Sequence, residues 1–212
     1  MTEKQSPITQ HRIKRKRVAR PPSFQVVGIS GPDGCGKTTL AQLIEERLDG
    51  KYVCFQVNFA DKLKRELLSF LISHKPNNAN VAELARAMTE KPTPEWARYL
   101  MRGWGDFQRD FNPEYWIQKW NYEVLLHVSQ PEVMEGPLPM LVLCSDVRYV
   151  NEVEAIQAHG GSVLYLDDAG QPLNTLLHQL PEVRQIADLG FTINSKVKQW
   201  ADVDQVIEAL SL

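Results

Sequence analysis

Short apolar runs alternate with segments of helical periodicity along this chain. The runs predict strands that are buried on both faces, at residues 24–30, 52–57, 140–144, 162–166 and 191–193. Between them, apolar residues recur at helical spacing, which predicts helices near 40–48, 63–72, 81–88, 150–158 and 203–210. Two more helices are expected to begin at Pro94 and near Pro113. Strands separated by helices indicate an α/β fold with a parallel sheet covered on both faces.

The loop between the first predicted strand and the first predicted helix has a phosphate-binding sequence. Residues 31–38 read Gly-Pro-Asp-Gly-Cys-Gly-Lys-Thr and match the pattern GxxxxGK[ST] in full. In such a loop, backbone N–H groups surround a phosphate, the lysine reaches the β- and γ-phosphates, and the Thr38 hydroxyl can bind Mg²⁺. The motif therefore predicts binding of ATP. The candidate ATP-binding residues are Gly31, Asp33, Gly34, Cys35, Gly36, Lys37, Thr38 and Thr39.

Three further residues lie where the partners of this loop are expected. Asp146 follows the buried run 140–145, in the position of a second Mg²⁺ ligand. Arg148 shares that edge of the sheet and could face the transferring phosphate, and Lys64 is a candidate phosphate ligand one turn into the second helix. The alternatives are, in turn, a loop aspartate or helix cap, a surface ion pair and an exposed lysine.

The helix that begins at Pro94 has two different faces. At 100° per residue, three arginines fall within about 40° of one another: Arg98, Arg102 and Arg109. The opposite side is apolar and holds Trp96, Leu100, Trp104 and Phe107. We expect the apolar side to pack in the core. The arginine side is suited to a second, anionic substrate if it lies beside the nucleotide site, and is otherwise a solvated surface.

Composition and charge are those of a globular protein with a basic N-terminal arm. Of 212 residues, 43% are hydrophobic and 24% are charged, and no apolar run is long enough to span a membrane. The three widely spaced cysteines favour reduced thiols, and the chain is expected to be cytoplasmic. Residues 1–20 carry a net charge of +6, so that the remainder carries −8 of the total of −2. The arm is suited to weak contact with nucleic acid, or is a solvated tail.

The combination of motifs resembles the phage-type deoxynucleoside monophosphate kinases, within the P-loop nucleoside-monophosphate kinase superfamily. Five segments carry the resemblance in order along the chain. They are the loop at 31–39, Phe-Ala-Asp-Lys-Leu-Lys at 59–64, the region 98–116 ending in Pro-Glu-Tyr-Trp, the block Asp146-Val-Arg-Tyr with Asn151 and Glu152, and a pattern of His178, Asp188 and Asn194. The family's His-x-Ser-Glu signature is replaced here by His-Gln-Leu-Pro-Glu at 178–182.

The resemblance implies a three-layer P-loop kinase fold with a mostly parallel, roughly five-stranded sheet. It implies ATP- and Mg²⁺-dependent phosphorylation of a (deoxy)nucleoside monophosphate to the diphosphate, in the cytoplasm, or in the host cytoplasm if the protein is viral. The implied acceptor contacts are Lys64, Arg98 and Arg109, with Arg148 in the phosphate pocket. Arg102, on the arginine side of the same helix, is a further candidate contact. The candidate catalytic residues are Lys37, Arg148 and Arg98, and the candidate metal ligands are Thr38 and Asp146.

The domain organisation expected from these features is one kinase domain after an arm. Residues 1–22 form the basic flexible arm, and residues 23–212 form the domain. Within it, we expect a helical acceptor-binding insertion at about 61–127 and a lid at about 167–188. The partners are small-molecule nucleotides, and the chain is expected to be a monomer or homodimer.

Two other functions remain open at this point. Another P-loop small-molecule kinase, thymidylate-kinase-like or acting on a dephosphorylated cofactor, would share the loop; Asp33-Gly34 looks like the loop of thymidylate kinases, but their Asp-Arg-Tyr segment is not found. A nucleic-acid-associated P-loop NTPase would use the arm to grip the phosphate backbone. The acidic body favours the mononucleotide kinase, because its positive residues gather in one pocket-sized region.

Overall fold

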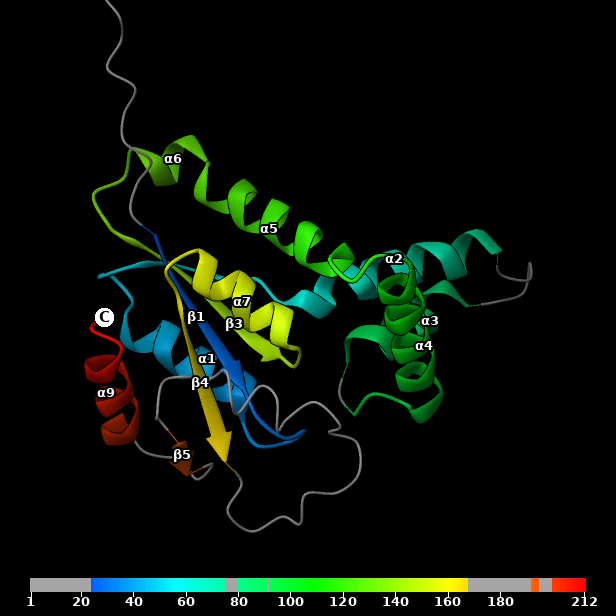
Figure 1. Ribbon diagram of the computed structural model, residues 1–212, viewed down its shortest axis with the longest axis horizontal. Coiled ribbons are helices and arrows are strands. Elements are labelled where there is room, and N and C mark those ends of the chain that lie inside the picture. Colours follow the sequence, from blue (N-terminus) through cyan, green and yellow to red (C-terminus); the bar gives the residue numbers. More distant parts are fainter. Residues whose placement is uncertain (1–23, 75–79, 91, 168–191, 195–199) are drawn as a thin grey trace, which may run out of the picture.

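A parallel sheet of five strands forms the centre of the molecule. The structure is a computed structural model that describes residues 24–74, 80–90, 92–167, 192–194 and 200–212. The strands follow the order β2-β3-β1-β4-β5, and every neighbouring pair is parallel (Figure 1). Their bounds are β1 Phe24–Ser30, β2 Val53–Gln56, β3 Met140–Val147, β4 Ser162–Asp167 and β5 Thr192–Asn194. The prediction of an α/β fold with about five mostly parallel strands is confirmed.

Helices cover both faces of this sheet. Their bounds are α1 Lys37–Arg47, α2 Phe59–His74, α3 Val81–Thr89, α4 Glu95–Phe111, α5 Tyr115–Val128, α6 Pro131–Met134, α7 Val150–Ala158 and α9 Trp200–Ala209. Helices α1 and α9 pack on one face, and α5 and α7 pack on the other. The three-layer arrangement expected from the alternation of strands and helices is therefore present.

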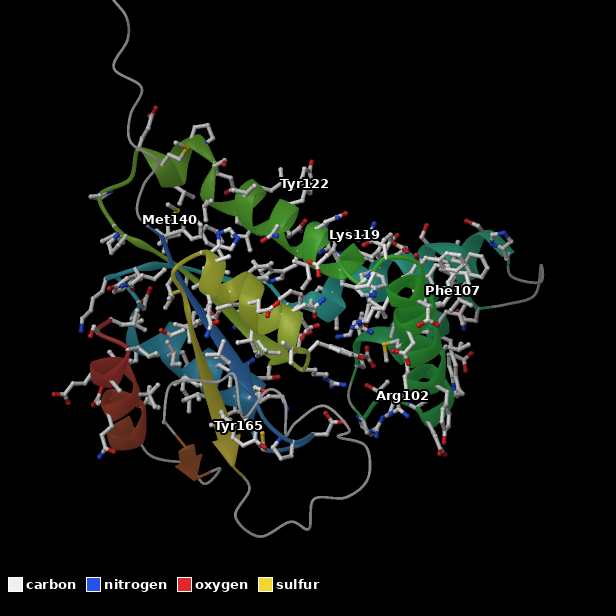
Figure 2. The ribbon with its side chains drawn as sticks, in the orientation of Figure 1. Arg102, Phe107, Lys119, Tyr122, Met140 and Tyr165 are labelled. Atoms are coloured by element: carbon white, nitrogen blue, oxygen red, sulfur yellow. The ribbon has the colours of Figure 1, made fainter. Side chains whose placement is uncertain are left out.

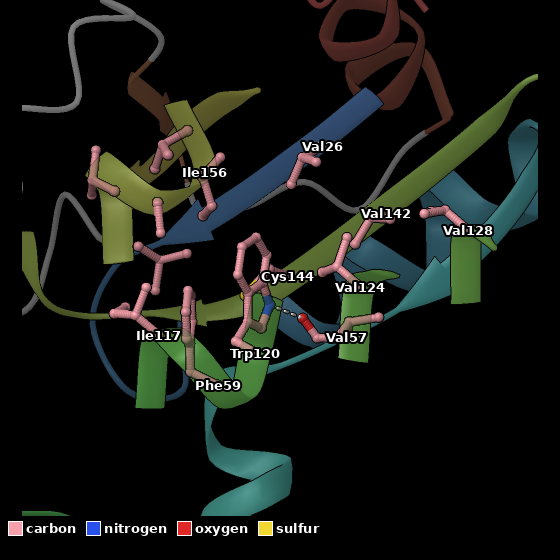
Figure 3. Packing of buried hydrophobic residues seen from close by; sticks show 14 of the residues in the cluster. Val26, Val57, Phe59, Ile117, Trp120, Val124, Val128, Val142, Cys144 and Ile156 are labelled. Atoms are coloured by element: carbon pink, nitrogen blue, oxygen red, sulfur yellow. Dashed lines mark hydrogen bonds between the residues drawn. The ribbon is translucent and has the colours of Figure 1, made fainter. Parts of the chain in front are cut away.

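Successive residues of β1 supply the two cores on either side of the sheet. Val27 packs with the α1 and α9 side chains, whereas its neighbour Val26 packs on the α5 and α7 side. On that second side, Trp120 is 1% exposed, and its indole N–H donates a hydrogen bond to the Val57 carbonyl oxygen over 2.9 Å (Figure 3). This bond satisfies the polar atom of a large buried side chain and ties α5 to the chain just after β2.

Helices α2, α3 and α4 pack around a small core of their own. Its buried members are Leu67, Ala87, Met88 and Ala97, with partly buried Leu71, Met101 and Trp104 against them. Figure 1 shows α3 and α4 beside the sheet rather than over it. This region contacts the rest of the protein mainly through α2, which meets α5 and β3, and less through α4, which meets α5.

The expectation that the apolar face of α4 packs in the core is wrong for most of that face. Trp96, Leu100 and Phe107 remain 43%, 42% and 51% exposed, and Phe107 is labelled in Figure 2. Of the four, only Trp104 is partly buried, against Phe70. The buried strip of α4 consists of Ala97 and Gly105, which lie between the aromatic side and the arginine side. These small residues let the helix approach its neighbours closely, so the contact uses them rather than the largest apolar residues.

Smaller differences concern the ends of elements. Strand β3 continues to Val147, opposite Ser30 of β1, so Asp146 is the second-last residue of the strand rather than lying beyond its end. A four-residue helix, α6, which the periodicity did not predict, precedes β3. Residues 1–22, most of the expected lid at 167–188, and His178 and Asp188 lie outside the described residues. Within the described residues, no helix is both long and apolar enough to cross a membrane.

Candidate nucleotide site

The glycine-rich loop connects the end of β1 to the start of α1, as the sequence predicted. Gly31, Gly34 and Gly36 adopt φ angles of 142°, 82° and 96°, which other L-residues rarely adopt. At Gly31 space is also limiting, because a Cβ atom would lie 2.5 Å from the Leu166 carbonyl oxygen of β4. The glycines therefore set the path of the backbone that brings the N-terminus of α1 to the edge of the sheet.

Lys37 is buried inside this loop, with 8% of its surface exposed. Its ammonium group donates hydrogen bonds to the carbonyl oxygens of Gly31 and Pro32 over 2.8 and 2.6 Å, and lies 3.8 Å from the Cys35 sulfur. Burial lowers the pKa of Lys37, and the nearby charges of Asp33 and Asp146 oppose that change. The positive charge of Lys37 is thus held within the loop, against the backbone that would surround a triphosphate.

Asp146 connects the end of β3 to the start of α2. Its two carboxylate oxygens accept hydrogen bonds from the backbone N–H groups of Phe59 and Ala60, over 3.0 and 2.8 Å. Anionic oxygens are favoured at a helix N-terminus, so this contact stabilises the first turn of α2. Of the two readings of Asp146, the helix cap is observed directly, and the role of metal ligand remains a prediction.

Asn58 joins the same edge from the end of β2. Its side-chain oxygen accepts hydrogen bonds from the Ser145 backbone N–H over 2.7 Å and from the Ser145 hydroxyl over 3.1 Å, while its N–H groups donate to Asp61. Sequence reasoning missed Asn58 and Ser145. The available signal was a polar residue directly after each of two buried strands, since the carboxyl ends of neighbouring parallel strands meet at one edge.

Arg148 extends from the end of β3 to the phosphate-binding loop. Its guanidinium donates a hydrogen bond to the Asp33 carboxylate over 3.0 Å, and both side chains are more than half exposed. The charge of Arg148 also reaches Lys37, whose pKa it lowers. Three residues singled out from the sequence, Lys37, Asp146 and Arg148, are therefore brought together at one edge of the sheet.

Arg109 is the arginine of α4 that reaches this edge. Its guanidinium lies 3.7 Å from the centre of the Tyr149 ring, 3.3 Å from the Asp106 carboxylate and 3.8 Å from the Glu152 carboxylate. Sequence reasoning missed Tyr149 as a partner, because nothing in the spacing along the chain places it under an arginine of a distant helix.

The other candidate acceptor residues lie apart from these contacts. The Arg98 guanidinium donates to the Thr93 carbonyl oxygen over 3.0 Å, Lys64 is 4.0 Å from Asp61, and Arg102 is exposed on α4 (Figure 2). Within the described part of the chain, none of the three is hydrogen-bonded or ion-paired to the phosphate-binding loop. The arginine face is thus divided, with Arg109 held at the edge of the sheet and Arg98 and Arg102 on the exposed helix.

Comparison with known proteins leaves the family of this chain unassigned. No family model and no curated protein matches it. Among solved structures, it is similar to an APS kinase from Mycobacterium tuberculosis, with a TM-score of 0.40 and 15% identity over 91% of this chain and 100% of the other. It is similar to a shikimate kinase from Aquifex aeolicus, with a TM-score of 0.41 and 13% identity over 88% and 96% of the two chains. Similarities of this size carry no argument about the function of this chain.

Proposed function

We propose that this protein is a kinase that transfers the γ-phosphate of ATP to a nucleoside monophosphate, with a deoxynucleotide as the preferred acceptor. The main support is the cluster at the edge of the sheet: Lys37 inside the glycine-rich loop, with Asp146 and Arg148 beside it. Phosphoryl transfer depends on positioning and on neutralising the charge of the transferred group, and these residues supply such charges. The resemblance in sequence motifs supports the choice of acceptor.

In the proposed reaction, an oxygen of the acceptor phosphate attacks the γ-phosphorus of ATP. The bond from the γ-phosphorus to the bridging β–γ oxygen breaks, and the products are ADP and the acceptor diphosphate. Lys37 binds the β- and γ-phosphates, and Arg148 approaches the transferred group from the end of β3. Arg148 can do so because its partner Asp33 is an exposed side chain, whose ion pair in water contributes little free energy.

Thr38 and Asp146 are the proposed residues for Mg²⁺, which when bound would neutralise charge on the phosphate oxygens. Each oxygen of Asp146 accepts one backbone hydrogen bond, and Oδ1 also accepts one from the Cys144 thiol over 3.3 Å. Among the described residues, the second lone pair of Oδ2 stays available. The carboxylate can therefore hold a Mg²⁺-bound water without leaving the start of α2. Within the described residues, no group of three His, Cys, Asp or Glu side chains could hold a metal alone, which fits an ion whose other ligands are phosphates and waters.

The acceptor is proposed to bind between the loop and the helices α2 to α4, within an insertion at about 61–127. Lys64, Arg98, Arg102 and Arg109 are its proposed contacts, with Arg98 also assisting transfer. Of these four residues, Arg109 is the one held beside Arg148, because its guanidinium lies over the ring of Tyr149, the next residue. Residues 167–188 remain the proposed lid.

Release of ADP in the presence of Mg²⁺ and ATP tests this function. Ribo- and deoxynucleoside monophosphates are compared as acceptors. Shikimate and sugar acceptors are tested in parallel, and single-stranded and duplex DNA are tested as activators of ATP hydrolysis. Rapid release with one or a few monophosphates is the expected result, and Lys37→Ala should abolish it. Lys51→Ala, in the exposed turn after α1, is the matched control. Release with DNA alone would instead favour the nucleic-acid-associated NTPase, and release with another small acceptor would favour a different kinase.

A further inference from the structure

Glu152 is an acidic side chain buried behind the candidate site. Only 3% of the residue is exposed, although it lies in the first turn of α7, close to the edge of the sheet. One of its oxygens accepts hydrogen bonds from the backbone N–H groups of Arg148 and Tyr149, over 2.6 and 3.1 Å. The carboxyl group therefore determines the path of the two residues that connect β3 to α7.

The other oxygen of Glu152 faces helix α4. It lies 3.8 Å from the guanidinium of Arg109, whose plane covers the Tyr149 ring at 3.7 Å. Arg109 is four-fifths buried, with 21% of its side chain exposed, so this contact is largely shielded from water. Glu152 thus contacts the guanidinium of Arg109 through one oxygen and the backbone of Arg148 through the other.

From Arg148 the contacts continue to the phosphate-binding loop. The Arg148 guanidinium donates to Asp33 over 3.0 Å. A continuous series of contacts therefore runs from α4 to the loop, through Arg109, Glu152, Arg148 and Asp33. Every contact in it is ionic, hydrogen-bonded or an arginine stacked on an aromatic ring, each of which depends on geometry.

We propose that Glu152 is a positioning residue that links Arg109, on the acceptor side, to Arg148, on the phosphate side. The inference rests on the proposed kinase function and extends it. A displacement of Arg109 when it binds the acceptor phosphate changes what Glu152 faces, and Glu152 holds the backbone from which the Arg148 side chain extends. Acceptor binding and the placement of Arg148 are then coupled, and such coupling acts equally in both directions.

The kinetic test asks whether Glu152 acts through Arg148. In Glu152→Gln, the amide oxygen can still accept from the two backbone N–H groups, but an NH₂ group replaces the oxygen that faces Arg109. At pH 9, above the pKa of about 8 that burial gives Glu152, its carboxylate is ionised, and kcat should fall by about 5- to 100-fold, with the Kd of ATP within about twofold of its original value. In an Arg148→Ala background, Glu152→Gln should have no further effect on kcat, because the effects of substitutions at residues that act through one another are not additive.

An equal loss of kcat from Glu152→Gln in both backgrounds would overturn the proposal, as would unchanged kcat in the single variant. Glu154→Gln is the matched control, because it makes the same substitution at an exposed position of the same helix, α7. The fraction of folded, ATP-binding protein is measured for each variant by titration, so that a loss of stability is not taken for a loss of rate.

Amide hydrogen exchange gives a second readout that needs no activity. In Arg109→Lys, which keeps the charge but loses the planar stack on Tyr149, the amides of Arg148 and Tyr149 should exchange at least about fivefold faster than in the original protein. Unchanged exchange at both amides would overturn the proposal. If the original protein transfers phosphate to no acceptor, the proposed function fails, and exchange alone decides whether Glu152 connects Arg109 to Arg148.

Discussion

The carboxylate of Asp146, at the end of β3, accepts a hydrogen bond from the backbone N–H of Ala60, in the first turn of α2, over 2.8 Å. The two residues are 86 positions apart in the sequence. Through this contact, the candidate Mg²⁺ ligand also holds the helix that begins the proposed acceptor-binding region. One residue therefore serves both the stability of α2 and the proposed chemistry.

Asp146→Ala should consequently lower both stability and activity. Loss of a helix cap costs about 1–2 kcal/mol of unfolding free energy, and loss of the proposed metal ligand should remove most phosphoryl transfer. Urea denaturation and a titration of activity with Mg²⁺ measure the two effects. Asn80→Ala removes the cap of α3, where the Asn80 side chain accepts from two backbone N–H groups. Asn80→Ala should lower stability to a similar extent and leave the Mg²⁺ dependence of activity unchanged. An equal change in the Mg²⁺ dependence of both variants would contradict the metal role of Asp146.

Arg148→Ala should lower activity strongly and leave stability almost unchanged, unlike Asp146→Ala, which should lower both. The Arg148–Asp33 pair is exposed, and exposed ion pairs contribute about 0–1 kcal/mol. Phosphoryl transfer should fall by about a thousandfold or more, the effect of removing an arginine that contacts the transferred phosphate. Thermal unfolding and single-turnover transfer measure the two quantities. A loss of less than tenfold in transfer would remove Arg148 from the reaction.

The two glycines in the middle of α4 should respond oppositely to substitution by alanine. A Cβ atom at Gly103 meets nothing within 4 Å, so Gly103→Ala should stabilise the helix by about 0.5–1 kcal/mol. A Cβ atom at Gly105 would lie 2.9 Å from Leu63 and 3.1 Å from Arg109, so Gly105→Ala should destabilise the contact between α4 and α2. Denaturation of the two variants side by side checks this. Equal effects would mean that α4 does not pack through its small residues.

The pH dependence of the unfolding free energy should report the raised pKa of Glu152 in the folded protein. Burial, together with the negative charge of Asp146, raises the pKa of Glu152 from 4.5 to about 8 in the folded protein. Between about pH 5 and 8 the folded state then binds more protons at this residue than the unfolded state does, so its contribution to stability falls as pH rises. Glu152→Gln does not titrate. The difference in unfolding free energy between the original protein and this variant should therefore shift against the original protein across that range, and a difference independent of pH would contradict the assignment.

Much of the fold followed from the sequence because most residues of the central strands β1 and β3 are buried. Val142 and its neighbours in β3 are apolar on both faces, and that pattern fits a central parallel strand. The glycine-rich loop was also recognisable, because its spacing is dictated by local backbone geometry. These features could be predicted from local sequence, since each is determined by residues that are close together along the chain.

The packing of α4 and the surroundings of Arg109 could not be predicted in the same way. Helical periodicity shows that Trp96 and Arg98 lie on different sides of α4, but not that Ala97, between them, makes the buried contact. The stacking of Arg109 on Tyr149 joins residues 40 positions apart, whose proximity depends on how α4 is placed beside the sheet. Such relationships require the tertiary structure.

Direct analysis of the products tests the central claim, that this protein transfers a phosphoryl group to a nucleoside monophosphate. Phosphorus NMR of a reaction containing Mg²⁺, ATP and the best acceptor of the panel should show ADP and the acceptor diphosphate forming in equal amounts, with no free phosphate. The Lys37→Ala variant should form neither. Formation of ADP with an equal amount of free phosphate, or unchanged ATP with every monophosphate, would contradict the account.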